Sequence, residues 1–141
     1  MNVLVDTSVW SIALRKRTIS KREEKVVQEL KELIYELRVV MIGPIRQELL
    51  SGISDNKKFR NLKEKIESFE DLPVTQEDYE TAAEISNICR KRGTQGTHTD
   101  FLICAVALKN DINIFTTDRD FNNYKKHVKI NLHDVREKKD N

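Results

Sequence analysis

The stretch NVLVDTSVW, residues 2–10, begins with a short run of aliphatic side chains and then reaches an acid, Asp6. Residues Val3 to Val5 are continuously apolar, without the alternation of a strand that has one face in water. This pattern is typical of a central strand in a parallel sheet, which helices cover on both faces. Because open α/β sheets bind ligands just beyond the carboxyl ends of their strands, we expect Asp6 to lie at a functional edge.

Other segments predict the rest of an α/β fold. Residues 39–42 (VVMI) and 112–117 (INIFTT) are further apolar runs that indicate buried strands, and residues 128–132 (VKINL) alternate like a strand near a sheet edge. Helical spacing of apolar side chains and capping signals predict helices at about residues 20–38, 45–51, 57–69, 75–92 and 97–108, with one helical turn at 11–14.

The length of 141 residues suits one domain with a substantial core, which we place at residues 1–135, followed by a charged tail at 136–141. The hydrophobic fraction of 38% and the charged fraction of 34% exclude the disordered class of chains. No segment approaches the roughly 18 apolar residues of a membrane span, and the first apolar run is too short for a secretory signal. We therefore expect no membrane association and a cytoplasmic location, where Cys89 and Cys104 are structural thiols.

The net charge of +2 does not by itself predict a polyanionic ligand, so local clusters must carry that argument. Basic side chains gather within residues 15–22, 57–63 and 90–92. Each cluster is compatible with an ordinary solvated helix surface. For an RNA ligand we expect contacts with the backbone and a steep salt dependence, with residues 15–22 as the first candidate.

Four carboxylates lie where predicted strands end or predicted helices begin: Asp6, Glu48, Asp100 and Asp118. Parallel strands bring such positions to one edge of a sheet. Taken singly, each acid has an ordinary explanation. Asp100 completes a capping box with Thr97, Glu48 suits a solvated helix surface, and Asp118 suits a turn. Taken together, they are harder to explain without a shared function.

Crowded acids need a counter-ion. Two unit charges about 4 Å apart repel by roughly 4 kcal/mol at the effective dielectric of a protein surface. A divalent cation removes that cost, and oxygen ligands without histidine or cysteine favour Mg²⁺ or Mn²⁺ over zinc. Because Mg²⁺ keeps water ligands, the pattern predicts phosphodiester hydrolysis. The hydroxyls of Ser8 and Thr117 are candidates for orienting a water or a carboxylate, although backbone capping is their simpler explanation.

Other chemistries find less support in the sequence. His98, His127 and His133 are widely separated or lie in polar segments, which is typical of surface histidines. A nucleophile elbow, a Walker loop and a dinucleotide-binding glycine pattern are all missing. A covalent phosphoryl acceptor at Asp6 would want a second acid two residues later, where Ser8 stands.

Four segments in this order resemble the PIN-domain ribonucleases, and the chain length resembles that of the VapC toxins of toxin–antitoxin pairs. The segments are VLVDTSVW (3–10), IRQEL (45–49), TDFLICA (99–105) and FTTDRDF (115–121). Carried over position by position, the family's acidic quartet corresponds to Asp6, Glu48, Asp100 and Asp118, and a supplementary acid of many members corresponds to Asp120.

The resemblance implies a three-layer α/β/α sandwich with a central, mainly parallel sheet. It implies an endoribonuclease dependent on Mg²⁺ or Mn²⁺, with catalysis by the quartet and metal binding by Asp6, Asp100, Asp118 and Asp120. It also implies an RNA substrate, frequent homodimers and inhibition by a small antitoxin. The alternative is a catalytically silent PIN-like module that only binds RNA or an antitoxin. We favour the enzyme, because a pure binder has no reason to tolerate the repulsion among the acids.

Overall fold

The structure, a computed structural model that describes residues 1–137, has three short parallel strands at its centre. They lie in the order β2-β1-β3, with the bounds β1 (Val3–Val5), β2 (Val39–Val40) and β3 (Asn113–Phe115). Every side chain of β1 is fully buried. The continuous apolar run near the N-terminus is therefore the central strand, as the sequence predicts.

The register of the strands brings their carboxyl ends to one edge. Leu4 lies opposite Val40 in β2. Val5 lies opposite Phe115 in β3, and the backbone amide of Asp6 then donates to the carbonyl of Phe115 at 2.9 Å. Asp6 and the residues that follow β3 consequently share the edge at which open α/β sheets bind ligands.

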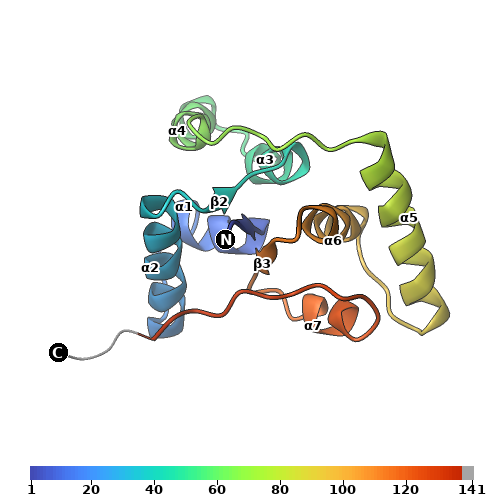
Figure 1. Cartoon of the computed structure of the whole chain (residues 1–141). Coiled ribbons are helices and arrows are strands. Elements are labelled where there is room, and N and C mark those ends of the chain that lie inside the picture. Colours follow the sequence, from blue (N-terminus) through green and yellow to red (C-terminus); the bar gives the residue numbers. More distant parts are fainter. Residues whose placement is uncertain (138–141) are drawn as a thin grey trace.

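Helices cover both faces of the sheet, so the molecule has three layers (Figure 1). One face carries α1 (Thr7–Leu14) and α2 (Lys21–Tyr35), and the other carries α5 (Gln76–Lys91) and α6 (His98–Asn110). The remaining helices lie near the sheet edges: α3 (Gly43–Leu50) and α4 (Asn56–Ile66) beside β2, and α7 (Asp120–Lys125) beyond β3. This is the predicted three-layer α/β fold with a parallel sheet.

α6 is the most deeply embedded helix. Its residues 101–107 are all buried, because the helix packs between the sheet and α5 (Figure 1). The small side chains of Ala105 and Ala107 permit this close packing. Its first turn carries Asp100, so the burial of α6 fixes the position of that acid.

The predicted strand at residues 128–132 is wrong. A single parallel bridge joins Leu132 to Ile114 there. The reason is that α7 ends just before this segment, with the amide of Val128 bonded to the carbonyl of Tyr124. Too few extended residues remain to form a ladder beside β3.

Short helices account for other differences from the sequence prediction. α7 has only six residues, which is too short to show a periodic signal. α1 begins at Thr7, earlier than the turn predicted at 11–14, because the side chain of Asp6 caps its first turn. The helix predicted at 45–51 begins at Gly43, with Pro44 in its first turn.

The charged C-terminal segment is anchored where it begins. Arg136 donates to the carboxylate oxygens of Glu29 at 3.0 and 3.1 Å and to those of Glu36 at 2.8 and 2.9 Å. Glu29 is only 2% exposed and also bonds to His133 at 2.6 Å. Arg136, the first residue of the predicted charged tail, is therefore held against α2, and residues 138–141 lie outside the described residues.

Both cysteines, Cys89 and Cys104, are buried and free, in agreement with the structural role predicted for them. Burial raises the pKa of the Cys104 thiol, which keeps it protonated and unreactive. Within residues 1–137, the structure has no helix of the length and apolar character that crossing a membrane requires.

Candidate functional site

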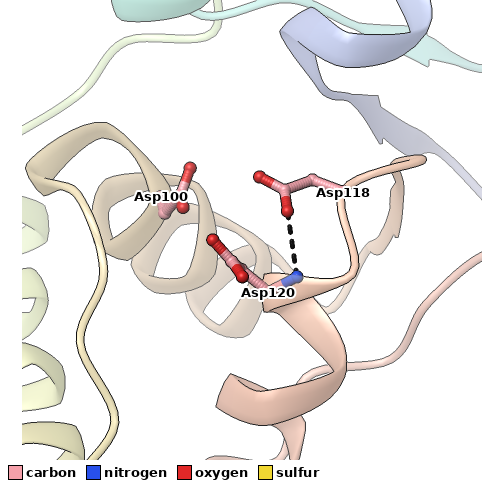
Figure 2. A group of neighbouring side chains, drawn as sticks. All are labelled: Asp100, Asp118 and Asp120. Atoms are coloured by element: carbon pink, nitrogen blue, oxygen red, sulfur yellow. Dashed lines mark hydrogen bonds between the residues drawn. The ribbon is translucent and has the colours of Figure 1, made fainter.

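Three carboxylates from separate parts of the chain meet at the carboxyl edge of the sheet (Figure 2). Asp100 lies in the first turn of α6, Asp118 in the loop after β3, and Asp120 at the start of α7. One oxygen of each carboxylate lies within 4.8 Å of an oxygen of the other two. We call these three residues the acid cluster. The structure thus brings together three of the predicted site residues, whose chemical roles stay predictions.

Backbone amides fix the two acids that follow β3. The amide of Asp118 donates to the hydroxyl oxygen of Thr116 at 3.0 Å. The amide of Asp120 donates to a carboxylate oxygen of Asp118 at 2.9 Å (Figure 2). This turn holds Asp118 and Asp120 close together although their charges repel.

Asp100 is the acid whose environment is least favourable to a charge. Burial, together with the negative charges of Asp6 and Asp118, raises its pKa to about 6. A hydrogen bond from Tyr124 acts in the opposite direction, because it stabilises the carboxylate. The amide of Asp100 also donates to the hydroxyl oxygen of Thr97 at 3.1 Å, so the N-cap of α6 sets its backbone.

Tyr124 orients the carboxylate of Asp100. Its hydroxyl donates to Oδ2 of Asp100 at 2.6 Å, and its fully buried ring packs against Phe101 and Phe121. Gly96 leaves room for this ring, because a Cβ at Gly96 would lie 2.5 Å from the phenol oxygen. Burial and the bond to Asp100 raise the pKa of Tyr124, so the phenol keeps its proton and remains a donor.

Asp6 lies beside the acid cluster and is 5% exposed. Its Oδ2 accepts hydrogen bonds from the hydroxyls of Ser8 at 2.7 Å and Thr116 at 2.8 Å. Hydroxyl groups therefore hold one oxygen of Asp6. Among the described residues 1–137, Asp6 is not part of the acid cluster. Its charge still acts on the cluster, since it raises the pKa of Asp100.

Glu48 is also outside the cluster. Its Oε1 accepts a hydrogen bond from the hydroxyl of Thr7 at 2.7 Å. Glu48, Thr7 and Thr99 line a hollow of about 500 Å³. Because Thr7 follows Asp6 and Thr99 precedes Asp100, this hollow borders the acidic edge.

The two hydroxyl residues singled out in the sequence have different environments. Ser8 contacts Asp6, and its hydroxyl oxygen also accepts from the amide of Thr117 at 3.0 Å. The hydroxyl of Thr117 makes no hydrogen bond within the described part of the chain. Thr116 contacts both Asp6 and Asp118 instead. The sequence prediction did not include Thr116 or Tyr124. The adjacent pair of threonines after β3 pointed to Thr116 as well as to Thr117.

The acid cluster suits a hard divalent cation. Its donors are carboxylate oxygens close enough to share one ion, without histidine or cysteine among them. Such a set favours Mg²⁺ or Mn²⁺ over softer metals. A cation would also relieve the like-charge repulsion that contributes to the raised pKa of Asp100. The residues present therefore fit the metal that the resemblance implies.

The sequence matches one known protein family over most of its length. The family model described as PIN domain matches residues 3–127. The chain belongs to the PIN domain family. The matched region begins at β1 and extends past α7, so it includes Asp6, Glu48 and the whole acid cluster.

Curated relatives of this PIN domain carry ribonuclease names. Ribonuclease VapC11 of Mycobacterium tuberculosis and a VapC ribonuclease of Mycobacterium bovis are each 31% identical to it over 121 residues. The aligned region covers 84% of this chain and 88% of each relative. The similarity therefore spans most of both proteins.

Solved structures share the fold of this PIN domain. FitAcB from Neisseria gonorrhoeae has a TM-score of 0.74 and 24% identity, covering 94% of this chain and 97% of that chain. VapBC2 from Rickettsia felis, bound to a DNA fragment from its promoter, has a TM-score of 0.73 and 17% identity, covering 94% and 98%. At these identities the likeness shows the fold alone, and it confirms the predicted fold class.

Proposed function

We propose that this PIN domain is a metal-dependent endoribonuclease that hydrolyses RNA phosphodiester bonds. The observation that best supports the proposal is the acid cluster, which gathers Asp100, Asp118 and Asp120 within 4.8 Å at the ligand-binding edge of the sheet. The names of the mycobacterial relatives support RNA as the substrate. A partly buried acid with a raised pKa, such as Asp100, is typical of functional sites.

The proposed cofactor is Mg²⁺, with Mn²⁺ as a substitute. Asp6, Asp100, Asp118 and Asp120 are the proposed ligands, with the last three forming the acid cluster and Asp6 lying beside it. A cation at this position supplies charge stabilisation at the phosphate and lowers the pKa of water. Tyr124 holds the carboxylate of Asp100 in place for binding. Thr116 does the same for Asp6 and for the backbone of Asp118.

Asp6 and Glu48 complete the proposed catalytic set with Asp100 and Asp118. Glu48 lies on the wall of the neighbouring hollow, where Thr7 holds one of its oxygens. We assign to it the positioning of water or substrate from that side. Ser8 supports Asp6 through its hydroxyl.

The chain is further proposed to be the toxin of a toxin–antitoxin pair, with a small antitoxin protein as its inhibitor. The VapC names of its relatives support this role, and FitAcB and VapBC2 supply the same fold. A homodimer and a cytoplasmic location belong to the same proposal.

Cleavage of a panel of structured RNAs by the pure protein tests the enzyme. We expect cleavage in Mg²⁺ or Mn²⁺, loss of cleavage in chelator, and a loss of about 100-fold or more for Asp6→Asn or Asp100→Asn. Asp111→Asn is a matched control, because it makes the same change at the exposed C-terminal end of α6. Cleavage that survives chelation or both site substitutions would contradict the proposal, and RNA bound but uncut across the panel would favour the silent module.

A further inference from the structure

A second hollow borders the acid cluster on the side of Asp118. It has a volume of about 650 Å³ and lies between the start of α2, the loop after β3 and residues 132–135. Thr117 and Asp118 form part of its wall, so it is continuous with the proposed active site. We call it the α2 hollow.

Three cations line the α2 hollow: Arg22, Lys25 and Arg119. All three side chains belong to exposed residues, and none makes a hydrogen bond or an ion pair within residues 1–137. Some other cations are paired, as Arg136 is with Glu29. These three are therefore free to meet a ligand without breaking an existing contact.

The acids of the α2 hollow do not cancel this positive charge. Glu23 is already paired with Lys16 at 2.6 Å, outside the set of lining cations. Asp118 belongs to the acid cluster, where the proposed metal would neutralise it. Asp134 is the remaining acid of the lining, and it faces three cations. With the metal bound, the hollow is electropositive beside the proposed point of cleavage.

We propose that the α2 hollow holds the sugar–phosphate backbone of the RNA strand on one side of the scissile bond, with Arg22, Lys25 and Arg119 contacting its phosphates. The inference rests on the proposed ribonuclease function and adds the path of the substrate. Cations beside a backbone supply affinity through counter-ion release and carry little sequence information. The α2 hollow is thus a positioning site that presents a phosphate to the acid cluster.

This placement revises the candidate drawn from the sequence, the basic residues 15–22. Arg15 and Arg17 line a different hollow with Lys58 of α4. Lys16 is held by Glu23. Of that cluster, Arg22 faces the α2 hollow, and its partners in the proposed site come from elsewhere in the chain.

The test compares two triple variants with equal loss of charge. The first is Arg22→Gln, Lys25→Gln, Arg119→Gln. The control, Lys57→Gln, Arg60→Gln, Lys63→Gln, changes exposed residues of α4, which lies on the β2 side of the sheet, opposite α7 (Figure 1). Every protein carries Asp100→Asn, so that RNA stays intact in Mg²⁺. Anisotropy of a labelled single strand of about 20 nucleotides, longer than a typical binding site, gives Kd as a function of salt.

We expect the first variant to bind about 100-fold more weakly near 0.1 M salt and to approach the parent near 1 M. Three lost phosphate contacts, each contributing about 0.7 to the slope of log Kd against log salt, reduce that slope by about 2. The control is expected to stay within about twofold of the parent, because its cations do not border the site. With Asp100 restored, single-turnover cleavage by the first variant should recover at saturating RNA, since the acids are intact.

Equal affinities or equal salt slopes for the two triple variants would overturn the inference. If the first variant keeps its RNA affinity but loses affinity for poly-glutamate, the α2 hollow serves an acidic protein segment and the RNA assignment is wrong. If the first triple variant melts far below the parent, the single variants Arg119→Gln and Arg60→Gln are compared in the same binding assay. Equal RNA affinities for these two would overturn the inference. Failure of the parent to cut RNA would contradict the proposed function separately, because the binding comparison does not depend on cleavage.

Discussion

The phenol of Tyr124 in α7 donates a hydrogen bond of 2.6 Å to Oδ2 of Asp100 in α6, so one helix fixes a carboxylate on another. Tyr124→Phe keeps the buried ring and removes the donor. Because that bond lowers the pKa of Asp100, its loss should raise this pKa above about 6. We expect about a tenfold loss of cleavage near pH 7, on the scale of a charge-assisted hydrogen bond, with recovery as the pH rises. The measurement is the pH dependence of kcat/KM.

Tyr79→Phe is the matched control, since Tyr79 is 54% exposed on α5, a helix that carries none of the three acids of the cluster. It should leave the pH profile unchanged. A Tyr124→Phe protein whose profile overlays that of the parent would show that the bond does not tune Asp100.

The raised pKa of Asp100 predicts a pH-dependent stability of the metal-free protein. A carboxyl group whose folded pKa is raised from 3.8 to about 6 favours folding while it is protonated. This contribution is fully present below pH 3.8 and is lost as the pH rises through 6. Asp100→Asn should therefore raise the free energy of unfolding at pH 7.5 in chelator, with a smaller gain at pH 4. Urea titrations at the two pH values measure both effects, and equal gains would contradict this account.

The pKa of Glu29 is shifted in the opposite direction to that of Asp100. Burial alone would raise its pKa, but hydrogen bonds from His133 and Arg136 outweigh burial and hold the pKa of Glu29 below 4.5. Its stabilising contribution is present above pH 4.5 and is lost as the pH falls through the folded pKa. Glu29→Gln should lower the free energy of unfolding by about 2 kcal/mol at pH 7, and by less at pH 3.

Glu24→Gln makes the same chemical change at an exposed position of α2 and serves as the control for Glu29. It should change the free energy of unfolding by less than about 0.5 kcal/mol. Equal losses for the two variants would mean that the contacts of Glu29 with the C-terminal segment do not stabilise the fold.

Leu37 follows α2 with a positive φ of 58°, in the left-handed region where glycine is favoured, and it is 89% exposed. Leu37→Gly should raise the free energy of unfolding by about 0.5–1 kcal/mol, because it relieves the Cβ clash and removes little packing. Leu37→Ala keeps the Cβ and should give no such gain. Thermal melting of the three proteins measures the difference.

The positions of Asp6, Asp100 and Asp118 at one edge could be predicted from the sequence, whereas Glu48 lies outside the acid cluster. Asp6 and Asp118 come after apolar runs, and the parallel register of β1 and β3 puts those runs side by side. Asp100 was found through a helix start. Each inference used local pattern together with one general property of parallel sheets.

The contacts that orient the acids were not predictable in the same way. The choice between Thr116 and Thr117 depends on how the chain turns after β3, which the apolar run does not determine. Tyr124 reaches Asp100 across 24 residues of sequence through a helix of only six residues. The anchoring of Arg136 by Glu29 is also a long-range contact, and a charged run is equally compatible with free chain.

Substitutions at Gly96 and at Tyr124 depend on each other, because the tyrosine ring fills the space that Gly96 leaves open. Since a Cβ at position 96 and the phenol of Tyr124 cannot occupy the same volume, a side chain gained at 96 forces the ring to move or to shrink. Gly96→Ala made first would force the Tyr124 ring out of its place, whereas a smaller residue at 124 made first would lose the hydrogen bond to Asp100 without causing a clash. Positions 96 and 124 should therefore change together among related chains, with position 124 changing first and the acids themselves unchanged.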